Sequence, residues 1–477
     1  MGRSRLGVGI ILTIVVIGGS VASPAAAGDS SASRAGRLDT SFGGGDGAMT
    51  VPRYSGVSPA QGETLVGLFV RPGGAFRTVT AGYASTPTGP AASTPGYVTV
   101  RGYRANGTVD PAFNRGAPRV LRNVISTSPG PGTGVVRTAM DSSGRIVVAT
   151  QTYDYACAGV CQIRLYRVLA DGRVDSTYHP VWARSALPGE LLRDLSVAIL
   201  SDGRARLCLT DDVNAPPPAT TWVFGYSAKG AVETSFGTGE KPGVALLPAT
   251  GVRCEATTAD PAGRLLVSWS YGPGLRVMRL TATGHVDTAF GASGTAQAAN
   301  WGRWLSPYGI TVSGRGSIYV SGQAAAYAGP TTGTAAARSI FVARLYPSGA
   351  VATGFGRRGV AIVSVAANRY QSSWAASTRA QRALSVDAAL RVYVPIASAQ
   401  QDATHGAAPG WVRLNGYTGT RDAAWGANGF VALPRSSRAD QSAGPVVQVS
   451  STKVLTGATL SLGARGVGAV VQRRWSR

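Results

Sequence analysis

Short runs of alternating apolar and polar residues, broken by Gly and Asp, recur from residue 36 to the end of the chain. Val, Ile, Leu and Tyr alternate with polar residues at the period of a β-strand that buries one face. Strand–turn–strand pairs stand out at residues 135–150, 310–322 and 384–397. No segment keeps a helical period long enough to compete, so the pattern predicts an all-β protein.

A glycine-containing motif recurs seven times. Each copy has a glycine, an acidic residue three positions later and an aromatic residue six positions after the glycine, and successive copies lie 54 to 71 residues apart. The copies are Gly36, Asp39, Phe42; Gly107, Asp110, Phe113; Gly172, Asp175, Tyr178; Gly230, Glu233, Phe236; Gly284, Asp287, Phe290; Gly349, Ala352, Phe355; and Gly419, Asp422, Trp425. The sixth copy has Ala352 in place of the acid. Chance does not align seven glycines in this way, so the motif marks a structural repeat.

Each repeat supplies four short strands: the strand–turn–strand pair, a strand before the glycine such as 275–280, and a strand after the aromatic residue such as 359–365. Seven units of four antiparallel strands predict a seven-bladed β-propeller, with a β-solenoid as the second choice. The chain begins with a motif and ends with a strand at 469–477. We therefore expect residues 48–52 to pair with that strand in one blade, a clasp that leaves no free sheet edge.

The repeated sequence GxLDxxFGxxG, with DGR(I/L)(V/L)V between copies, resembles the bacterial delta-60 repeat family. The pair at 135–150 also resembles blades of NHL-type propellers. The likeness covers essentially all of the chain after its N-terminal segment, with Ala352, Asn114 and His179 as departures. The resemblance implies an exported or surface propeller and brings no set of catalytic residues with it.

The N-terminal segment has the order of a secretory signal. Arg3 and Arg5 precede an uncharged run at 6–17, and small residues follow up to residue 27. The apolar run has 12 residues, whereas a membrane span needs about 20; an uncleaved anchor is the alternative. We predict a signal peptide at 1–27, a short flexible N-terminus at 28–35 and a propeller at 36–477, with the mature chain extracellular or in the cell envelope, without a membrane span, and monomeric.

Four cysteines follow the signal segment, and an even number in an exported chain favours disulfides. Cys208 falls late in one strand pair and Cys254 begins the next, at the same rim of neighbouring blades, which predicts a Cys208–Cys254 bridge. A second bridge, Cys157–Cys161, is expected within one loop. The latter spacing resembles half of a metal site, but no second pair completes it, and we expect no metal or cofactor.

Composition and charge narrow the classes of partner. With 44% hydrophobic residues the chain can bury a large core, which excludes disorder for most of it. The formal net charge is +23, and 43 of the 46 basic residues are Arg. No block of basic residues is present, so nucleic acid is not an expected partner. A compositional bias toward Arg explains the charge, and weak attraction to an anionic envelope polymer stays open.

The repeated motif is interpreted as structural. Its Asp is expected to bond backbone N–H groups in a turn, its Gly to take a positive φ, and its aromatic residue to pack between blades. One acid per blade cannot form the oxygen shell of Ca²⁺. The motifs HExxH, G-x-S-x-G and the P-loop are absent, and no catalytic residue is predicted. Asp211, Asp212 and Asn214 form the one dense oxygen cluster, interpreted as an exposed turn.

Long connections are expected to share one face of the propeller, at 53–65, 84–96, 151–161, 210–220, 297–308, 323–339, 364–382 and 397–410. Loops on a rigid scaffold commonly carry binding sites. The candidate ligand-binding residues in these loops are Tyr153, Tyr155, Trp301, Arg303, Trp304, Tyr308, Tyr370 and Trp374. Trp301 and Trp304 flank Arg303, an arrangement that suits stacking on sugar rings or holding an anionic polymer.

The sequence predicts a secreted, non-catalytic propeller that binds a glycan, an envelope polymer or a protein through this face. The alternative is an extracellular hydrolase or lyase that acts on carbohydrate, because propellers support both kinds of site. Inward-facing carboxylates with shifted pKa values would favour the enzyme.

Overall fold

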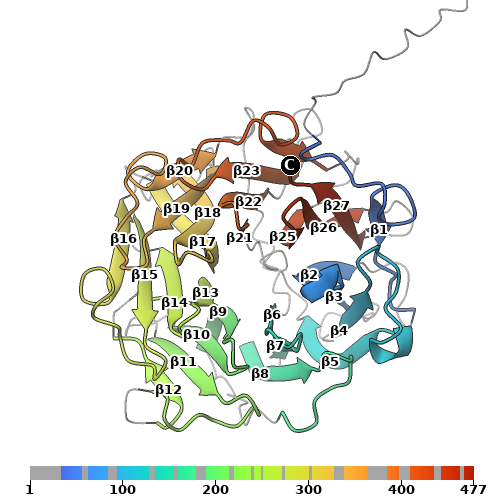
Figure 1. Ribbon diagram of the computed structural model, residues 1–477. Helices are drawn as coiled ribbons and strands as arrows, with labels where there is room; N and C mark the ends of the chain where they lie inside the picture. The colour runs from blue at the N-terminus through green and yellow to red at the C-terminus, as the bar shows by residue number, and fades with distance from the viewer. Residues whose placement is uncertain are drawn as a thin grey trace, which may run out of the picture. The chain divides into compact units, whose positions relative to one another are not determined.

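Alternating strands and tight turns produce seven antiparallel sheets arranged around a common centre (Figure 1). The computed structural model describes residues 34–55, 63–83, 94–127, 135–154, 159–178, 190–213, 220–237, 241–248, 251–270, 274–299, 303–326, 338–363, 384–396, 409–433, 442–461 and 467–477. These residues belong to one compact unit, Arg34–Arg477. The protein is thus an all-β, seven-bladed propeller, as the sequence predicts.

The blades are numbered in chain order, each from its innermost strand. Blade 1 contains β2 (Glu63–Val70), β3 (Phe76–Tyr83), β4 (Thr94–Tyr103) and β5 (Arg119–Thr127); blade 2 contains β6 (Val136–Met140), β7 (Ile146–Asp154) and β8 (Gly159–Val168). Blade 3 contains β9 (Glu190–Ile199), β10 (Ala205–Val213), β11 (Thr220–Tyr226) and β12 (Val244–Leu246); blade 4 contains β13 (Ala256–Ala259), β14 (Leu265–Ser270), β15 (Gly274–Leu280) and β16 (Thr295–Ala299).

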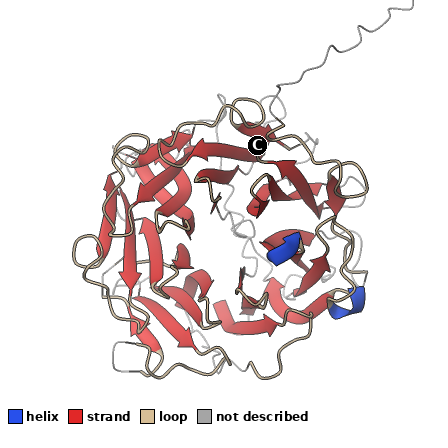
Figure 2. Ribbon diagram, viewed as in Figure 1, coloured by secondary structure: helices blue, strands red, loops and turns tan. Residues whose placement is uncertain are grey.

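Blade 5 contains β17 (Arg303–Val312), β18 (Ile318–Ala326), β19 (Arg338–Leu345) and β20 (Val360–Val363); blade 6 contains β21 (Ser385–Val386), β22 (Arg391–Ile396), β23 (Gly410–Asn415) and β24 (Phe430–Ala432). Blade 7 contains β25 (Ser442–Ser450), β26 (Lys453–Ser461) and β27 (Val467–Trp475), with β1 (Ala48–Thr50) at its outer edge. The helical pieces among the described residues are two short 3-10 turns, η1 (Pro72–Gly74) and η2 (Asn114–Gly116) (Figure 2).

Blade 7 is assembled from both ends of the chain. Strand β1 pairs antiparallel with β27, so that Ala48 faces Gln472 and Thr50 faces Val470. Just before β1, the N–H of Gly36 donates to the carbonyl oxygen of Trp475 at 2.8 Å. The first and last described segments therefore share one sheet.

Tight turns join the first two strands of several blades, and a repeated Asp–Arg pair shapes three of them. The Asp141 carboxylate accepts the N–H of Arg145 at 2.8 Å and forms an ion pair with the Arg145 side chain at 2.6 Å. Asp260 with Arg264, and Asp387 with Arg391, repeat both contacts. These turns mark the end of the sheets opposite to the long connections.

The apolar core lies between blades rather than at the centre of one sheet. Each buried cluster combines residues of neighbouring blades; for example, Val277 of β15 packs in the same cluster as Val320 of β18. The seven motif aromatic residues are all buried, with exposed fractions of at most 5%. Removing apolar surface at every interface between blades is therefore what holds the ring together.

Several strands run further than their sequence pattern indicates. Strand β17 begins at Arg303, so Arg303, Trp304 and Tyr308 are strand residues, and the prediction that they lie in a loop at 297–308 is wrong. Tyr153 likewise belongs to β7. A β-bulge between Pro307 and Gly309 interrupts the alternation in β17, which hides the strand from a period-two pattern.

Asp211 and Asp212 lie in β10 rather than in an exposed turn, so that interpretation is also corrected; Asn214 is outside the described residues. The compact unit begins at Arg34, and Ala35 is already buried in it. Within the described ranges no helix has the length and apolar character to cross a membrane.

Candidate functional site

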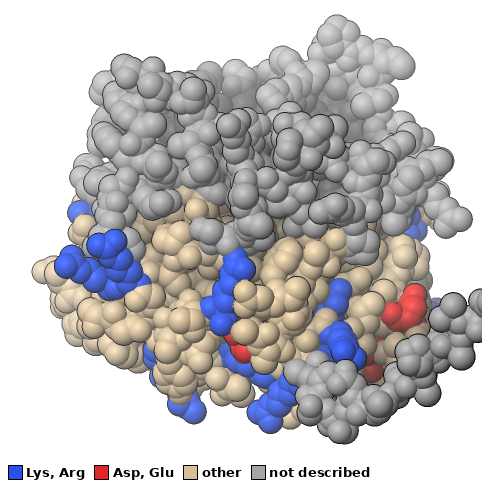
Figure 3. Space-filling model, turned by 90° about the horizontal axis from the view of Figure 1, so that it is seen from above, with Lys and Arg blue, Asp and Glu red and all other residues tan. Residues whose placement is uncertain are grey.

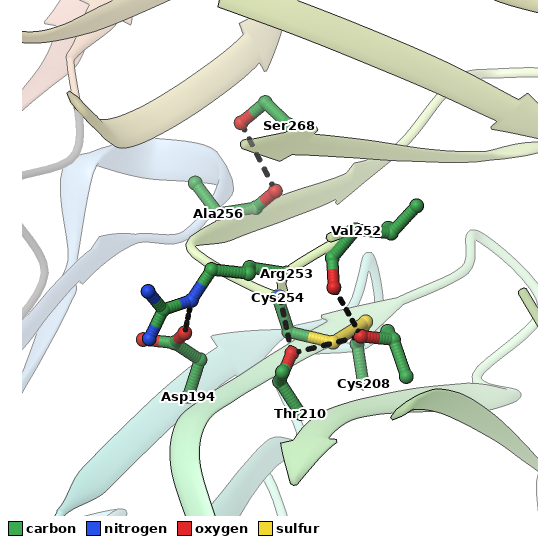
Figure 4. Close-up of a disulfide and its surroundings, with 9 residues drawn as sticks. Asp194, Cys208, Thr210, Val252, Arg253, Cys254, Ala256 and Ser268 are labelled. Atoms are coloured by element: carbon green, nitrogen blue, oxygen red, sulfur yellow. Dashed lines mark hydrogen bonds and ion pairs between the residues drawn. A yellow bond between two sulfur atoms is a disulfide. The ribbon is translucent and has the colours of Figure 1, made fainter. Parts of the chain in front are cut away.

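The segment that precedes β13 in blade 4 is fastened to blade 3 by a disulfide and by hydrogen bonds (Figure 4). Cys208 of β10 and Cys254 form the predicted bridge, with their Cα atoms 5.6 Å apart. The N–H of Cys254 donates to Thr210 Oγ1 at 2.7 Å, and the Thr221 hydroxyl donates to the carbonyl oxygen of Val252 at 2.5 Å. These links fix residues 252–254 against the neighbouring blade.

Arg253, in the middle of this fastened segment, reaches across to β9. Its Nε lies 2.9 Å from Oδ2 of Asp194, and Figure 4 shows the pair beside the disulfide. The Asp194 side chain is 3% exposed, whereas the Arg253 side chain is 31% exposed. The ion pair therefore has one buried partner and one that solvent reaches.

Glu255 follows directly and is only partly exposed. Its carboxylate accepts the Ser270 hydroxyl at 2.9 Å and the Ser270 N–H at 3.1 Å. Burial and then the negative charge of Asp194 raise the pKa of Glu255, while the hydrogen bonds from Ser270 and the charge of Arg253 lower it, and the net pKa is about 8. Glu255 is thus protonated at neutral pH beside an ion-paired carboxylate.

This group of four residues, Asp194, Arg253, Glu255 and Ser270, is called the inner acidic cluster. Strands β9 and β13 are the innermost strands of their blades (Figure 1). Glu255 precedes β13 and Ser270 ends β14, so both lie at the end of blade 4 opposite to the Asp260–Arg264 turn. The cluster therefore faces the end of the sheets where the long connections leave.

Two carboxyl groups in different environments can act as an acid and a base, because one holds its proton where the other has lost it. The same groups, with Arg253, can also bind hydroxyl groups of a ligand without chemistry, since a neutral acid donates a hydrogen bond and a carboxylate accepts one.

Glu63, at the start of the innermost strand of blade 1, differs from Glu255 in its surroundings. It is 1% exposed and accepts hydrogen bonds from the Tyr54 N–H at 2.8 Å, the Thr80 hydroxyl at 2.6 Å and the Tyr97 hydroxyl at 3.2 Å. Burial and the Glu63 charge raise the pKa of Tyr97. With these three donors around it, Glu63 stabilises blade 1 and is not part of the candidate site.

Most of the aromatic residues predicted to bind ligand fall outside the described residues, namely Trp301, Tyr155, Tyr370 and Trp374. For Arg303, Trp304 and Tyr153 the strand is described but the side chain is not. Tyr308 is half-buried, and its hydroxyl donates to Gln323 Oε1 at 2.9 Å. Cys157 is outside the described residues, as is the side chain of Cys161.

The repeated motif forms a link between neighbouring blades, built on a buried arginine. Asp287 receives Arg279 Nε at 2.7 Å, and the Arg279 guanidinium lies over the ring of Phe290 at 4.5 Å. Arg279 Nη1 also donates to the carbonyl oxygen of Pro347, in the turn of the next blade, at 2.5 Å. The other carboxylate oxygen of Asp287 accepts the N–H of Ala289 at 3.3 Å. Each motif acid can thus serve both its own turn and an arginine.

Five further blades repeat this link. The pairs are Arg473 with Asp39, Arg77 with Asp110, Arg167 with Asp175, Arg206 with Glu233 and Arg413 with Asp422. Each of these arginines donates to a carbonyl oxygen of the next blade, at Ala105, Ala170, Ala228, Ala282 and Ser476 respectively. Burial by itself raises the pKa of Asp39, but hydrogen bonds from Lys453 and Ser41 and the charge of Arg473 lower it to about 2.

The arginine comes from two different strands. In most blades it is on the strand before the glycine, but Arg77 and Arg206 are on the neighbouring strand, opposite Gly102 and Gly225. A Cβ atom at Gly225 would lie 2.6 Å from the Phe236 ring, so a glycine is needed where the aromatic residue packs closest. From composition alone, the Arg content is explained by a compositional bias toward Arg. The structure shows that the motif arginines have a structural role, because they link neighbouring blades.

The fold is that of a seven-bladed β-propeller, and its described disulfide and arginine links lie between neighbouring blades. A family model described as "Domain of unknown function (DUF5122) beta-propeller" matches residues 142–178. A comparison with curated protein sequences gives no match.

A comparison with solved structures gives several distant matches. The polysaccharide lyase Uly1 has 10% identity and a TM-score of 0.43, with 90% of this chain and 92% of that chain covered. The α-L-arabinofuranosidase Arb93A of Fusarium graminearum has 11% identity and a TM-score of 0.39, covering 71% and 92%. An α-L-arabinanase of Penicillium chrysogenum has 10% identity and a TM-score of 0.40, covering 71% and 92%.

Proposed function

We propose that this protein is an exported propeller of the delta-60 repeat type that binds a glycan without chemical turnover. The ligand would enter from the long-connection end and contact the inner acidic cluster. The observation that carries the proposal is Arg253, which is part-exposed, paired with buried Asp194, and held by a segment fastened through the Cys208–Cys254 bridge. A disulfide of this kind persists in oxidising compartments, which fits export. Envelope polymers and proteins are the other classes of ligand that the same face could take.

Preorganised polar groups favour binding because little ordering is left to occur when the ligand arrives. Arg253 supplies several donors in a fixed plane, and Glu255 supplies a donor and an acceptor. These are the groups that sugar hydroxyls require. Trp301, which precedes β17 in the sequence, and Trp304, at the start of β17, would complete the site by stacking.

A glycan and cell-wall polymer binding screen tests this proposal. The chain without residues 1–27 is screened first, and the variants Arg253→Gln and Trp301→Ala/Trp304→Ala are then titrated with each ligand found. We expect at least tenfold weaker binding by both variants at a temperature where they are folded. The melting temperature of Trp301→Ala/Trp304→Ala should change little, whereas that of Arg253→Gln should fall because buried Asp194 loses its ion pair with Arg253. Arg264→Gln, at the opposite end of blade 4, is the matched control and should bind as the parent does. Unchanged binding by the Arg253 variant would place the site elsewhere.

A second function, glycoside hydrolysis, is favoured by one observation. The raised pKa of Glu255 beside the ion-paired Asp194 is the arrangement that lets one carboxyl act as a general acid and the other as a base or nucleophile. Release of reducing ends from neutral and acidic polysaccharides measures such activity. Hydrolysis by the parent that disappears in both Glu255→Gln and Asp194→Asn would establish an enzyme. A parent that binds the polysaccharide and does not hydrolyse it would establish a binding protein.

A further inference from the structure

Blade 5 carries the one motif copy without an acid, and its arginine has a different environment from the other six. Ala352 occupies the acidic position, and Arg344 is the arginine of this copy. The backbone is unchanged, since the Ala352 N–H donates to the Arg344 carbonyl oxygen at 3.0 Å, as Asp287 does to Arg279 at 2.9 Å. The difference is therefore confined to side chains.

Arg344 is 8% exposed, and no ion pair joins it to any of the residues that the structure describes. Its Nη2 donates to the Ser317 hydroxyl at 3.2 Å, while its buried Nε has no hydrogen-bond partner. A guanidinium keeps its charge at any accessible pH, and a buried charge without a counter-charge is unfavourable. The other six motif arginines all face a carboxylate.

Among the described residues, Arg344 makes no hydrogen bond to the next blade, unlike the other motif arginines. The carbonyl oxygen of Gly416, in the turn of blade 6, accepts the hydroxyl of Tyr319 at 2.9 Å. In the other blades the motif arginine itself makes the bond to the next turn. Tyr319 therefore makes the hydrogen bond between blades 5 and 6 that the motif arginine makes in the other blades.

Two tyrosine rings border this arginine at the surface. The Arg344 Cζ lies 5.6 Å from the ring centre of Tyr346 and 5.4 Å from that of Tyr417. These side chains are 45% and 47% exposed, which is unusual for rings in a propeller whose other described aromatic residues are mostly buried. Arg315, which is exposed, donates to the Tyr417 hydroxyl at 2.5 Å and adds positive charge. A Cβ atom at Gly354, which lies within the motif between Ala352 and Phe355, would have no heavy atom within 4 Å.

We propose that Arg344 binds the carboxylate of a sugar acid, with the rings of Tyr346 and Tyr417 against the apolar face of the sugar. The carboxylate would take the place that Asp287 and its counterparts fill in the other blades, where arginine and carboxylate meet in the geometry they prefer. The site lies at the motif end of blades 5 and 6, away from the inner acidic cluster, and does not depend on the function proposed for that cluster.

The test compares the motif copy of blade 5, which has Ala352, with the copies of the other blades, which have an acid. Ala352→Asp restores the acid of the other copies and should occupy Arg344, while Arg344→Met removes the cation. Ala112→Asp adds the same charge at an exposed position of blade 1 and serves as the matched control. Sodium glucuronate is titrated by calorimetry, with glucose, sodium acetate and sodium chloride at equal ionic strength as references.

We expect glucuronate to bind the parent and the Ala112→Asp variant equally, and at least tenfold more weakly to Ala352→Asp and Arg344→Met. Ala352→Asp should also raise the melting temperature in the absence of ligand, which shows that the variant is folded and that the new acid reaches Arg344. Tyr346→Ala should weaken glucuronate and leave acetate unchanged. Equal affinity for acetate and glucuronate overturns the assignment to a sugar acid, and equal binding by the parent and Ala352→Asp overturns the site.

Discussion

At the scale of single residues, the ion pairs of this propeller differ greatly in their contact with solvent. Within blade 2, the Arg167–Asp175 pair has side chains 4% and 7% exposed, while the Arg173–Asp171 pair has side chains 73% and 45% exposed. Removing one partner of a buried pair leaves the other charge without compensation, whereas exposed pairs contribute little. The two pairs therefore allow a direct comparison.

We predict that Arg167→Met lowers the free energy of unfolding by about 3–5 kcal/mol, since Asp175 is left buried and unpaired. Arg173→Met should change it by less than about 1 kcal/mol. Denaturant unfolding of both variants measures the difference. The double variant Arg167→Met/Asp175→Asn should recover part of the loss, and equal midpoints for the two single variants would contradict the buried link.

Glu255 gives a residue-scale prediction in pH. Its pKa is about 8 in the folded protein and near its ordinary value, 4.5, when unfolded, so the folded state binds more protons between these values. The contribution of protonated Glu255 to the free energy of unfolding is fully present below about pH 4.5 and is lost as the pH rises through about 8. Glu255→Gln should remove this part of the pH dependence, measured as denaturation midpoints between pH 5 and 8. A variant whose midpoints change with pH as the parent's do would show that another group titrates.

At the scale of elements, the Cys208–Cys254 bridge joins β10 of blade 3 to the segment that precedes β13 of blade 4, across 46 residues of sequence. A disulfide over such a span typically contributes about 2–4 kcal/mol, largely by restricting the unfolded chain. We predict a loss of this size for Cys208→Ala/Cys254→Ala in denaturant unfolding. The parent with reductant should unfold at nearly the same midpoint as the variant, and a variant as stable as the oxidised parent would show that hydrogen bonds alone fasten the blades.

The sequence predicts strands where a repeat spaces them, and between repeats it predicts the Cys208–Cys254 bridge and the β1–β27 pairing. It does not predict the ion pairs of charged side chains, which do not follow the repeat. Gly284 and Phe290 locate their blade because a turn glycine and a buried ring recur at fixed spacing. The arginine links do not recur in this way, since Arg279 is five residues before Gly284 but Arg77 is thirty before Gly107. Asp194 and Arg253 meet only after folding, 59 residues apart.

At the scale of the whole molecule, closure depends on β27, which lies between β26 and β1 in blade 7. Deleting the last ten residues removes most of that strand along with Arg473, the partner of Asp39. We predict a fall in melting temperature of more than roughly 10 °C, because both ladders and a buried ion pair are lost. Deleting only Arg477, which is exposed, is the control. A ten-residue truncation that melts like the full chain would show that closure contributes nothing to stability.

The pairing of β1 with β27 in blade 7 also determines when the ring can close during synthesis of the chain. Between the end of β1 at Thr50 and the start of β27 at Val467 lie 416 residues. A ribosome that adds about 5–20 residues per second needs roughly 20 to 80 s to make them. Strand β1 is therefore the first of the described strands to be made and the last to find its partner. Until β27 has been synthesised the nascent ring stays open, with β1 unpaired and available to chaperones or to another chain.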